Sequence, residues 1–291
     1  MEYNETNEAR YEEIVSSKRQ PWISLLQAAR KEDVHNLLPK ALLRSLGTVR
    51  SVPMLWLMPT KRARRWFASR KLRKWGRSIC NLVDSRLEVI GKDLIPHDRA
   101  CLFVCNHMSP MDIPVLATVI PEHFAFVANQ IFETIPVFHF WTKHSGSVYV
   151  KQGDGVAELA ALKSMTARLA NGTSLLLFPE GYIHQGEGLA PFKRGGLSSA
   201  LLAKAPIIPM CLYGTQIAMP PGRLYIEPGV RIRLEFSSPI ETAGMTRNER
   251  KELISMVRER MLSMKAEAQV ITGYPVIDPN FGSEGRVVSE T

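Results

Sequence analysis

A histidine and an aspartate stand where the sequence predicts that a strand gives way to a helix. His107 and Asp112 lie between an apolar run over 100–105, typical of a buried strand, and another over 113–120, typical of a helix. A carboxylate at this position can accept a hydrogen bond from the imidazole Nδ1–H. That bond would fix the tautomer and leave Nε2 to take a proton from a substrate. The pair therefore predicts a general base.

The same residues also have a purely structural interpretation. Ser109 is a favourable N-cap and Pro110 favours the first helical position, so the helix is expected to begin there. Ser-x-x-Asp is close to a capping box, in which Asp112 would bond only the backbone amide of Ser109. His107 would then be an ordinary loop histidine. The local sequence leaves both interpretations open.

Size and composition indicate a globular protein with a substantial core. The 291 residues, 45% of them apolar, suit one large α/β domain with extensions or two small domains. The four cysteines lack the spacing of a disulfide framework, and the N-terminus does not resemble a secretory signal, so a reducing, cytosolic compartment is expected. Cys101, Cys105 and His107 share one face of the predicted strand. Positions four apart on a strand are roughly 13 Å apart, which is too far to hold one metal ion.

The whole net charge of +9 comes from one segment. Residues 61–77 carry nine of the 37 basic residues and no acidic residue, and the remaining 28 basic residues balance the 28 acidic ones. Apolar residues recur through this segment at helical spacing. The pattern favours an interfacial helix drawn to anionic lipid, although a nucleic-acid-binding helix or a solvated helix packed on the domain has the same composition. The residues expected to bind the membrane are Trp56, Arg64, Arg65, Trp66, Phe67, Arg70 and Lys71.

The apolar run over 52–58 precedes this basic segment. It has about a third of the length that a membrane-spanning helix needs, and Arg44 and Arg50 lie just before it. A spanning helix is therefore not expected. The run fits either a segment that lies in the membrane interface or a half-buried hairpin.

The rest of the chain divides by pattern into four parts. We expect a disordered N-terminus over 1–20, a basic helical membrane-interface module over 21–85, a catalytic α/β domain over 86–270 and a loose tail over 271–291. Strands are expected over 87–90, 100–105, 124–128, 146–151, 174–178 and 206–213, with a hairpin over 223–227 and 230–236. Helices are expected over 109–120, 156–170 and 246–268, and 131–141 fits a broken helix or a substrate-lining segment.

This alternation predicts an α/β fold with a mixed, mostly parallel sheet flanked by helices, and an N-terminal helical extension. Sites in such sheets form at the carboxyl ends of the strands. His107 and Glu180 each follow the end of a predicted strand. The two side chains are therefore expected to share one cleft.

Four short motifs follow one another in the predicted domain. They are Asn-His-x-Ser-x-x-Asp over 106–112, Gly-Ser-Val-Tyr-Val-Lys-Gln over 146–152, Phe-Pro-Glu-Gly over 178–181 and Pro-Ile-Ile-Pro over 206–209. Each motif alone is weak, but their order and spacing resemble the glycerolipid acyltransferase family over roughly 86–236. The run Phe-Lys-Arg-Gly-Gly over 192–196 is also similar to the segment that follows the third motif of that family.

The resemblance assigns a reaction to these residues. It implies that His107 is the general base and that Asp112 orients it. An acceptor hydroxyl would attack the thioester of acyl-CoA or acyl-carrier protein, with no other cofactor and no acyl-enzyme. The oxyanion would be stabilised by backbone amides at the start of the helix. Glu180 and Gly181 would shape the site of a lyso-lipid acceptor, with lysophosphatidate as the first choice.

Three positions depart from the family pattern. Gln152 and Ile183 stand where relatives that use lysophosphatidate carry arginines associated with the acceptor phosphate, and Asn129 replaces a lysine. Neutral side chains cannot replace that charge. Lys193 and Arg194, near a helix start, could supply it, and Lys151 is also expected to bind substrate. Otherwise the acceptor is another lyso-lipid, such as an ornithine lipid, a glycolipid or a larger lysophospholipid.

The resemblance also decides how we interpret the basic segment. Acceptors and products of such enzymes reside in the bilayer, so a peripheral protein on the cytoplasmic face of an anionic membrane is expected, and nucleic acid is not expected as a partner. A non-catalytic lipid- or nucleic-acid-binding protein on the same scaffold is the alternative. The intact pair of His107 and Asp112 argues against it.

Overall fold

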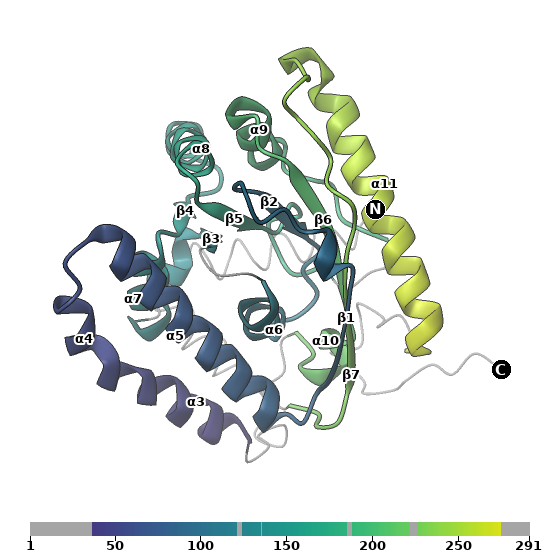
Figure 1. The fold of residues 1–291 in the computed structure, drawn as a ribbon. Helices are drawn as coiled ribbons and strands as arrows, with labels where there is room; N and C mark the ends of the chain where they lie inside the picture. The colour runs from purple at the N-terminus through teal and green to yellow at the C-terminus, as the bar shows by residue number, and fades with distance from the viewer. Residues whose placement is uncertain (1–36, 121–123, 135, 185–187, 222–225, 275–291) are drawn as a thin grey trace.

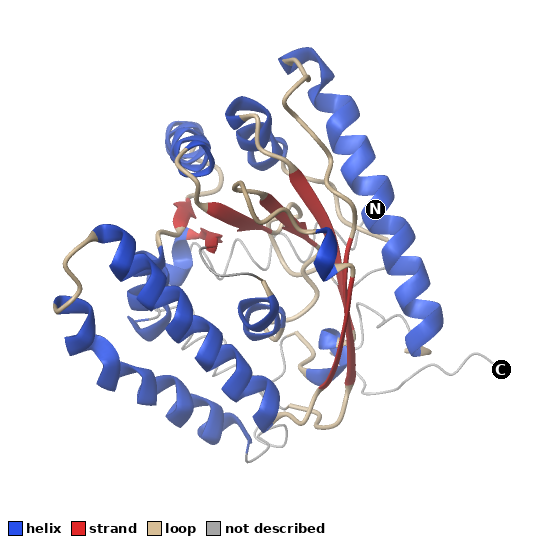
Figure 2. Cartoon of the chain, viewed as in Figure 1, coloured by secondary structure: helices blue, strands red, loops and turns tan. Residues whose placement is uncertain are grey.

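In this computed structural model, seven strands form a single sheet with helices on both faces (Figures 1 and 2). The structure describes residues 37–120, 124–134, 136–184, 188–221 and 226–274. The sheet order is β1-β7-β6-β2-β5-β3-β4. The predicted N-terminus over 1–20, the first part of the predicted module up to residue 36 and most of the predicted tail lie outside the described residues.

The strands are β1 (Arg86–Ile90), β2 (Leu102–Cys105), β3 (Phe124–Asn129), β4 (Val148–Val150), β5 (Ser174–Leu177), β6 (Ile207–Tyr213) and β7 (Arg231–Phe236). The α-helices are α3 (Leu37–Gly47), α4 (Val52–Trp56), α5 (Lys61–Leu82), α6 (Asp112–Val119), α7 (Pro136–Ser145), α8 (Gly155–Ala170), α9 (Arg194–Ala203), α10 (Thr215–Ala218) and α11 (Arg250–Thr272). Short 3-10 helices are η2 (Thr48–Ser51), η3 (Lys92–Leu94), η4 (Gln130–Thr134) and η5 (Arg247–Glu249).

Alternate residues of each strand face opposite layers of helices, as the pleat of a strand requires. On β2, Phe103 and Cys105 belong to the core that contains α5 and α6, whereas Leu102 and Val104 belong to the core that contains α8, α9 and α11. Because both faces are covered, the strand reads as one continuous apolar run. The predicted fold class is confirmed.

Parallel pairing brings the two motif-bearing strands together. β2 pairs in parallel with β5 on one side and with β6 on the other, and Val104 lies opposite Leu177. The segments that follow these strands, which begin at Asn106 and at Phe178, therefore leave the sheet at the same edge. β3 and β4 run in the same direction and end at this carboxyl edge too.

The predicted hairpin over 223–227 and 230–236 is wrong. One edge of β7 pairs with β6 in antiparallel fashion, and its other edge pairs with β1 in parallel. With both edges occupied, β7 offers no backbone groups to a hairpin partner. Residues 222–225 lie outside the described part of the chain.

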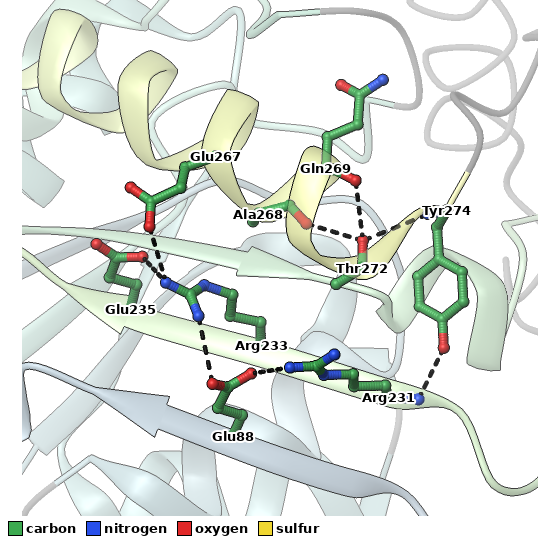
Figure 3. Close-up of polar contacts among 9 residues, drawn as sticks. All are labelled: Glu88, Arg231, Arg233, Glu235, Glu267, Ala268, Gln269, Thr272 and Tyr274. Atoms are coloured by element: carbon green, nitrogen blue, oxygen red, sulfur yellow. Dashed lines mark hydrogen bonds and ion pairs between the residues drawn. The ribbon is translucent and has the colours of Figure 1, made fainter.

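Charged side chains join β1, β7 and α11 (Figure 3). The buried guanidinium of Arg233 lies 3.4 Å from the Glu88 carboxylate, 3.0 Å from Glu235 and 3.2 Å from Glu267 on α11. Arg231 pairs with the other oxygen of Glu88 at 3.0 Å. A buried cation is costly unless it is paired, so these three carboxylates allow Arg233 to sit beneath α11.

The basic helix α5 packs its apolar face onto the domain rather than projecting it outward. Its buried residues are Phe67, Ala68, Ser69, Leu72, Gly76, Ile79 and Cys80. Phe67 is 8% exposed, and its ring lies 6.3 Å from that of Trp141 on α7. The prediction that Phe67 contacts the membrane is therefore wrong, because the rest of the protein already covers the apolar face of α5.

The contact between α5 and α6 depends on Gly76. A β-carbon at this position would lie 2.4 Å from the Pro114 carbonyl oxygen and 2.8 Å from the Thr118 hydroxyl. Only a residue without a side chain lets the two helix backbones come this close. None of the helices in the described ranges has the length and apolar character that crossing a bilayer requires.

Gly76→Ala should destabilise the protein even though alanine favours a helix. The gain in helix propensity is about 1 kcal/mol, but overpacking against a backbone carbonyl typically costs more, so we expect a net loss of about 1–2 kcal/mol. Urea unfolding of the purified protein measures it. The matched control is Gly155→Ala in α8, where the added carbon meets nothing within 4 Å and stability should hold or rise. Equal urea midpoints of unfolding for Gly76→Ala and Gly155→Ala would contradict close packing at Gly76.

Candidate active site

The histidine and aspartate predicted to form a pair are in direct contact. His107 Nδ1 lies 2.7 Å from Asp112 Oδ2, and both residues are buried, with 8% and 0% of their surface exposed. A carboxylate oxygen can only accept here, so Nδ1 carries the hydrogen. None of the described residues bonds the other ring nitrogen, Nε2. The imidazole is thus held in the tautomer that leaves Nε2 as a proton acceptor.

Asp112 holds the loop as well as the ring. Its Oδ2 also accepts the backbone N–H of Met108 at 2.8 Å and that of Ser109 at 3.0 Å. The capping bond and the imidazole bond therefore coexist on one oxygen. The other oxygen, Oδ1, has no partner among the described residues.

The helix begins later than the sequence predicts. Asp112 is its first residue, and Ser109 does not cap it. The Ser109 hydroxyl instead accepts the Met111 N–H at 3.0 Å and donates to the Met219 carbonyl at 2.7 Å. The Asp112 N–H donates to the Ser109 carbonyl at 3.1 Å.

These bonds narrow the prediction that backbone amides at the helix start stabilise an oxyanion. The N–H groups of residues 108, 109, 111 and 112 are all bonded within the loop, and residue 110 is proline. An amide that already donates cannot aim its hydrogen at a substrate oxygen. No described contact engages the N–H of Ile113, the second residue of α6, so an oxyanion donor at the helix start stays a prediction for that amide.

The segment after β5 fixes His107 from the other side. The Glu180 carboxylate accepts the His107 N–H at 3.1 Å, and the His184 N–H donates to the His107 carbonyl at 2.8 Å. The Phe178 ring stacks on the imidazole with centroids 4.0 Å apart and an interplanar angle of 14°. Both the backbone and the ring of His107 are therefore positioned by the Phe-Pro-Glu-Gly segment.

Glu180 is a buried carboxylate that joins two loops. Its second oxygen accepts the Ala190 N–H at 2.8 Å, and only 1% of the residue is exposed. Burial raises the pKa of Glu180 to about 7, although the two backbone hydrogen bonds and the Lys265 ammonium oppose the shift. With both oxygens occupied, this arrangement does not favour the predicted contact between Glu180 and an acceptor headgroup.

Asn106 anchors the start of the loop to β6. Its side-chain amide donates to the Leu212 carbonyl and accepts the Leu212 N–H, each at 2.8 Å. The amide thus continues the ladder between β2 and β6 after the β2 backbone has turned away. His107 is the next residue, so the loop leaves the sheet at a fixed point.

Gln152, Gly181 and Lys193, which come from three separate motifs of the sequence, lie together at the turn that contains Gly181. Gly181 has φ +80°, a conformation that favours glycine. The Gln152 side chain donates to the Gly181 carbonyl at 3.0 Å, and a β-carbon at 181 would lie 3.3 Å from Cγ of Lys193. The residue that stands in place of the family arginine therefore supports the turn, and Lys193 brings a cation beside it.

The other two predicted acceptor-binding cations lie at the periphery. Lys151 follows β4 at the carboxyl edge and pairs with Asp154 at 3.2 Å. Arg194 is exposed and is the first residue of α9, where the helix dipole adds positive potential. No described contact joins either residue to His107, so their role in binding stays a prediction.

Exposed apolar side chains lie along α3, η2, α4 and the residue after α4. We call this set of side chains the α3–α4 apolar surface. Trp56 is 81% exposed and Leu57 is 79% exposed. Of the other residues expected at the membrane, Trp66 is partly buried beneath Arg70, and Lys71 lies over the Phe67 ring. The residues of the α3–α4 apolar surface are Leu42, Leu43, Leu46, Val49, Met54, Trp56 and Leu57.

Two positioning residues were missed by sequence reasoning, although both lie within the quoted motifs. Asn106 precedes the histidine, and Phe178 opens the Phe-Pro-Glu-Gly motif. A polar residue at the end of a buried strand is a signal that could have identified Asn106, because a buried amide must find partners. The stacking of Phe178 on His107 depends on strand neighbours and has no local signal.

Comparisons with known proteins identify acyltransferases as similar to this chain. The sequence model of the Acyltransferase family matches residues 86–213. A 1-acyl-sn-glycerol-3-phosphate acyltransferase of Cocos nucifera is 24% identical over 212 residues, which cover 72% of this chain and 67% of that protein. One from Chlamydomonas reinhardtii is 31% identical over 139 residues, which cover 47% of this chain and 42% of that protein.

A solved structure shares the fold. The crystal structure of the 1-acyl-sn-glycerophosphate acyltransferase of Thermotoga maritima matches with a TM-score of 0.64 and 25% identity, over 78% of this chain and 95% of that one. Together with the family model, this match confirms the resemblance that the motifs indicate.

Glu180→Gln should change how the free energy of unfolding depends on pH. The pKa of Glu180 is about 7 in the folded protein, above its ordinary value of 4.5. A raised pKa contributes stability that is fully present below about pH 4.5 and is lost as the pH rises through about 7, by roughly 3 kcal/mol. Glutamine does not titrate, so the variant should lack this component.

The difference in unfolding free energy between the wild type and Glu180→Gln should change with pH in one direction. Glutamine can accept only one of the two backbone N–H groups, which costs about 1–3 kcal/mol at every pH. The variant should therefore be less stable than the wild type at pH 5, and the difference should narrow towards pH 8. Urea unfolding at intervals across this range measures the difference, and a constant gap would show that Glu180 is not the titrating group.

Proposed function

This chain belongs to the glycerolipid acyltransferase family, and from that premise we propose that it acylates the hydroxyl of lysophosphatidate from a thioester donor, with His107 as general base. The observation that carries the proposal is the bond between His107 Nδ1 and Asp112, with Nε2 left unbonded by the described residues. A neutral imidazole held in this way accepts a proton near neutral pH.

The chemistry follows from this geometry. Nε2 removes the proton of the acceptor hydroxyl as its oxygen attacks the thioester carbon, and Asp112 stabilises the imidazolium that forms. The tetrahedral intermediate then collapses, the carbon–sulfur bond breaks and the thiolate leaves. The imidazolium returns its proton to the thiolate, so His107 ends the cycle neutral. Acyl-CoA and acyl-carrier protein present the same thioester, so either can serve as donor.

Two observations support a phosphate-bearing acceptor. The relatives and the solved structure with which the chain aligns are named for 1-acyl-glycerol phosphates. Lys193 passes beside the Gly181 turn and can pair with phosphate as a point charge. Gln152 is neutral and already bonded to that turn, so the family arginine has no equivalent there. An acceptor with another headgroup is the second candidate because of this substitution.

A membrane location would deliver such an acceptor. The α3–α4 apolar surface exposes seven large apolar side chains, and α5 beside it carries the basic run. An exposed apolar patch next to positive charge suits an anionic bilayer surface. We therefore place the protein at the membrane periphery, with α3 and α4 rather than the buried face of α5 entering the interface.

His107→Ala should lower turnover by about 10²–10⁴-fold, because general base catalysis contributes that much. Asp112→Asn should lower it by roughly 10²-fold or more, since an amide can hold the wrong tautomer. Release of free thiol from acyl-CoA, assayed against lysophosphatidate, lyso-ornithine lipid and other lysophospholipids, measures both effects and identifies the acceptor. His97→Ala, at an exposed histidine, is the matched control. Full activity of His107→Ala on the preferred acceptor would refute the assignment.

Replacing Trp56 and Leu57 together by serine should reduce binding to anionic vesicles. Full burial of two large apolar side chains contributes about 3–6 kcal/mol, so a loss of at least tenfold in partitioning is expected even if they enter only partly. Co-sedimentation with vesicles of mixed phosphatidylglycerol and phosphatidylcholine measures the loss. Val270→Ser, at a residue 82% exposed on α11, is the control. Unchanged binding of the double variant would rule out this surface as the membrane contact.

A further inference from the structure

Two arginines from distant parts of the chain meet at Gly146. This buried glycine has φ +96° and connects α7 to β4. Nη1 of Arg168 lies 3.1 Å from the point where a β-carbon of residue 146 would stand, and Nε of Arg65 lies 3.4 Å from the same point. The missing side chain therefore leaves room in which the guanidinium groups of α5 and α8 approach each other.

This pair of cations has no counter-charge among the residues that the structure describes. Within the described ranges, neither side chain makes an ion pair or a hydrogen bond, and both are partly buried. Burial and the charge of Arg65 lower the pKa of Arg168. Arg233 shows the contrast, because the fold surrounds that buried guanidinium with three carboxylates. Two like charges this close together repel each other, and a bound anion would offset that repulsion.

The pair is remote from the proposed catalytic centre. Gly146 precedes β4, and Arg168 lies in the last turn of α8, just before β5. Both therefore lie at the amino edge of the parallel strands, whereas His107 follows β2 at the carboxyl edge. An anion at Gly146 would not be the acceptor at the reacting centre.

Guanidinium groups match the geometry of phosphate oxygens, and two of them can share one phosphate. We propose that Arg65 and Arg168 form a binding site for a single phosphate group, separate from the acyl-transfer site. The surroundings favour a lipid headgroup as its source. Arg64 donates to the Met58 carbonyl at 3.1 Å, so this turn of α5 lies beside the exposed Trp56 and Leu57. Figure 1 shows α5 next to α7, which leads into Gly146.

Thermal unfolding of the full chain tests the site with inorganic phosphate as the probe, against sodium chloride of equal ionic strength. The wild type should melt about 5 °C or more higher at saturating phosphate. Arg168→Gln should lose most of this shift and, in chloride, should melt no lower than the wild type because a like-charge contact is removed. Arg65→Gln is the second variant, and Lys163→Gln, exposed on α8, is the charge-matched control that keeps the shift.

A second arm identifies the source of the phosphate. Vesicles of phosphatidylglycerol and phosphatidylcholine should retain the wild type and Lys163→Gln but bind Arg168→Gln several-fold less. If Arg168→Gln loses the thermal shift but binds vesicles like Lys163→Gln, the ligand is a free phosphate. Phosphate bound near Lys193 is common to all of these proteins, so only differences between them count. Identical behaviour of Arg168→Gln and Lys163→Gln in both arms overturns the proposal.

Discussion

The hydrogen bonds that converge on Oδ2 of Asp112 are the constraint on which the candidate active site depends. One oxygen accepts from the imidazole and from two successive backbone amides, so the ring and its loop cannot move independently. A base that must meet a hydroxyl at hydrogen-bonding distance requires this rigidity. Glu180 and Ser109 accept the N–H groups of residues 107, 111 and 112, so the loop amides around the ring are all bonded. The loop thus positions His107 with amides that could otherwise have stabilised an oxyanion.

The parallel sheet explains why a segment more than seventy residues away completes this arrangement. β5 lies beside β2, so the Phe-Pro-Glu-Gly segment leaves the sheet next to His107 and bonds its backbone at both N–H and carbonyl. Glu180 has to be buried to do this, and burial disfavours its charge. A carboxylate suits this position because the N–H groups of His107 and Ala190 need an acceptor with two oxygens. The stability that Glu180 contributes therefore depends on pH, in the near-neutral range in which the proposed base would act.

The sequence predicted those features that neighbouring residues alone determine. Continuous apolar runs predicted β2, β5 and β6, and the spacing of His107 and Asp112 predicted their contact, because a short loop limits where the two can lie. The helix start and the partners of β7 were mispredicted, since tertiary bonds from Met219, β1 and β6 decide them. Helical spacing on α5 predicted an apolar face but could not show that α6 and α7 cover it. Arg65 and Arg168 meet across a glycine, and nothing in either segment alone indicates that contact.

The neutral residue at 152 alters how an acceptor phosphate would be recognised. A guanidinium fork specifies two oxygens in one plane, whereas an ammonium acts as a point charge that tolerates several orientations. Gln152 is engaged with the Gly181 carbonyl, so the cation closest to that turn in the described part of the chain is Lys193. Recognition by Lys193 would depend more on charge than on the shape of the phosphate. A site of this kind would discriminate poorly between a terminal phosphate and a phosphate that carries a further headgroup, so selection among acceptors would fall to the space around the turn.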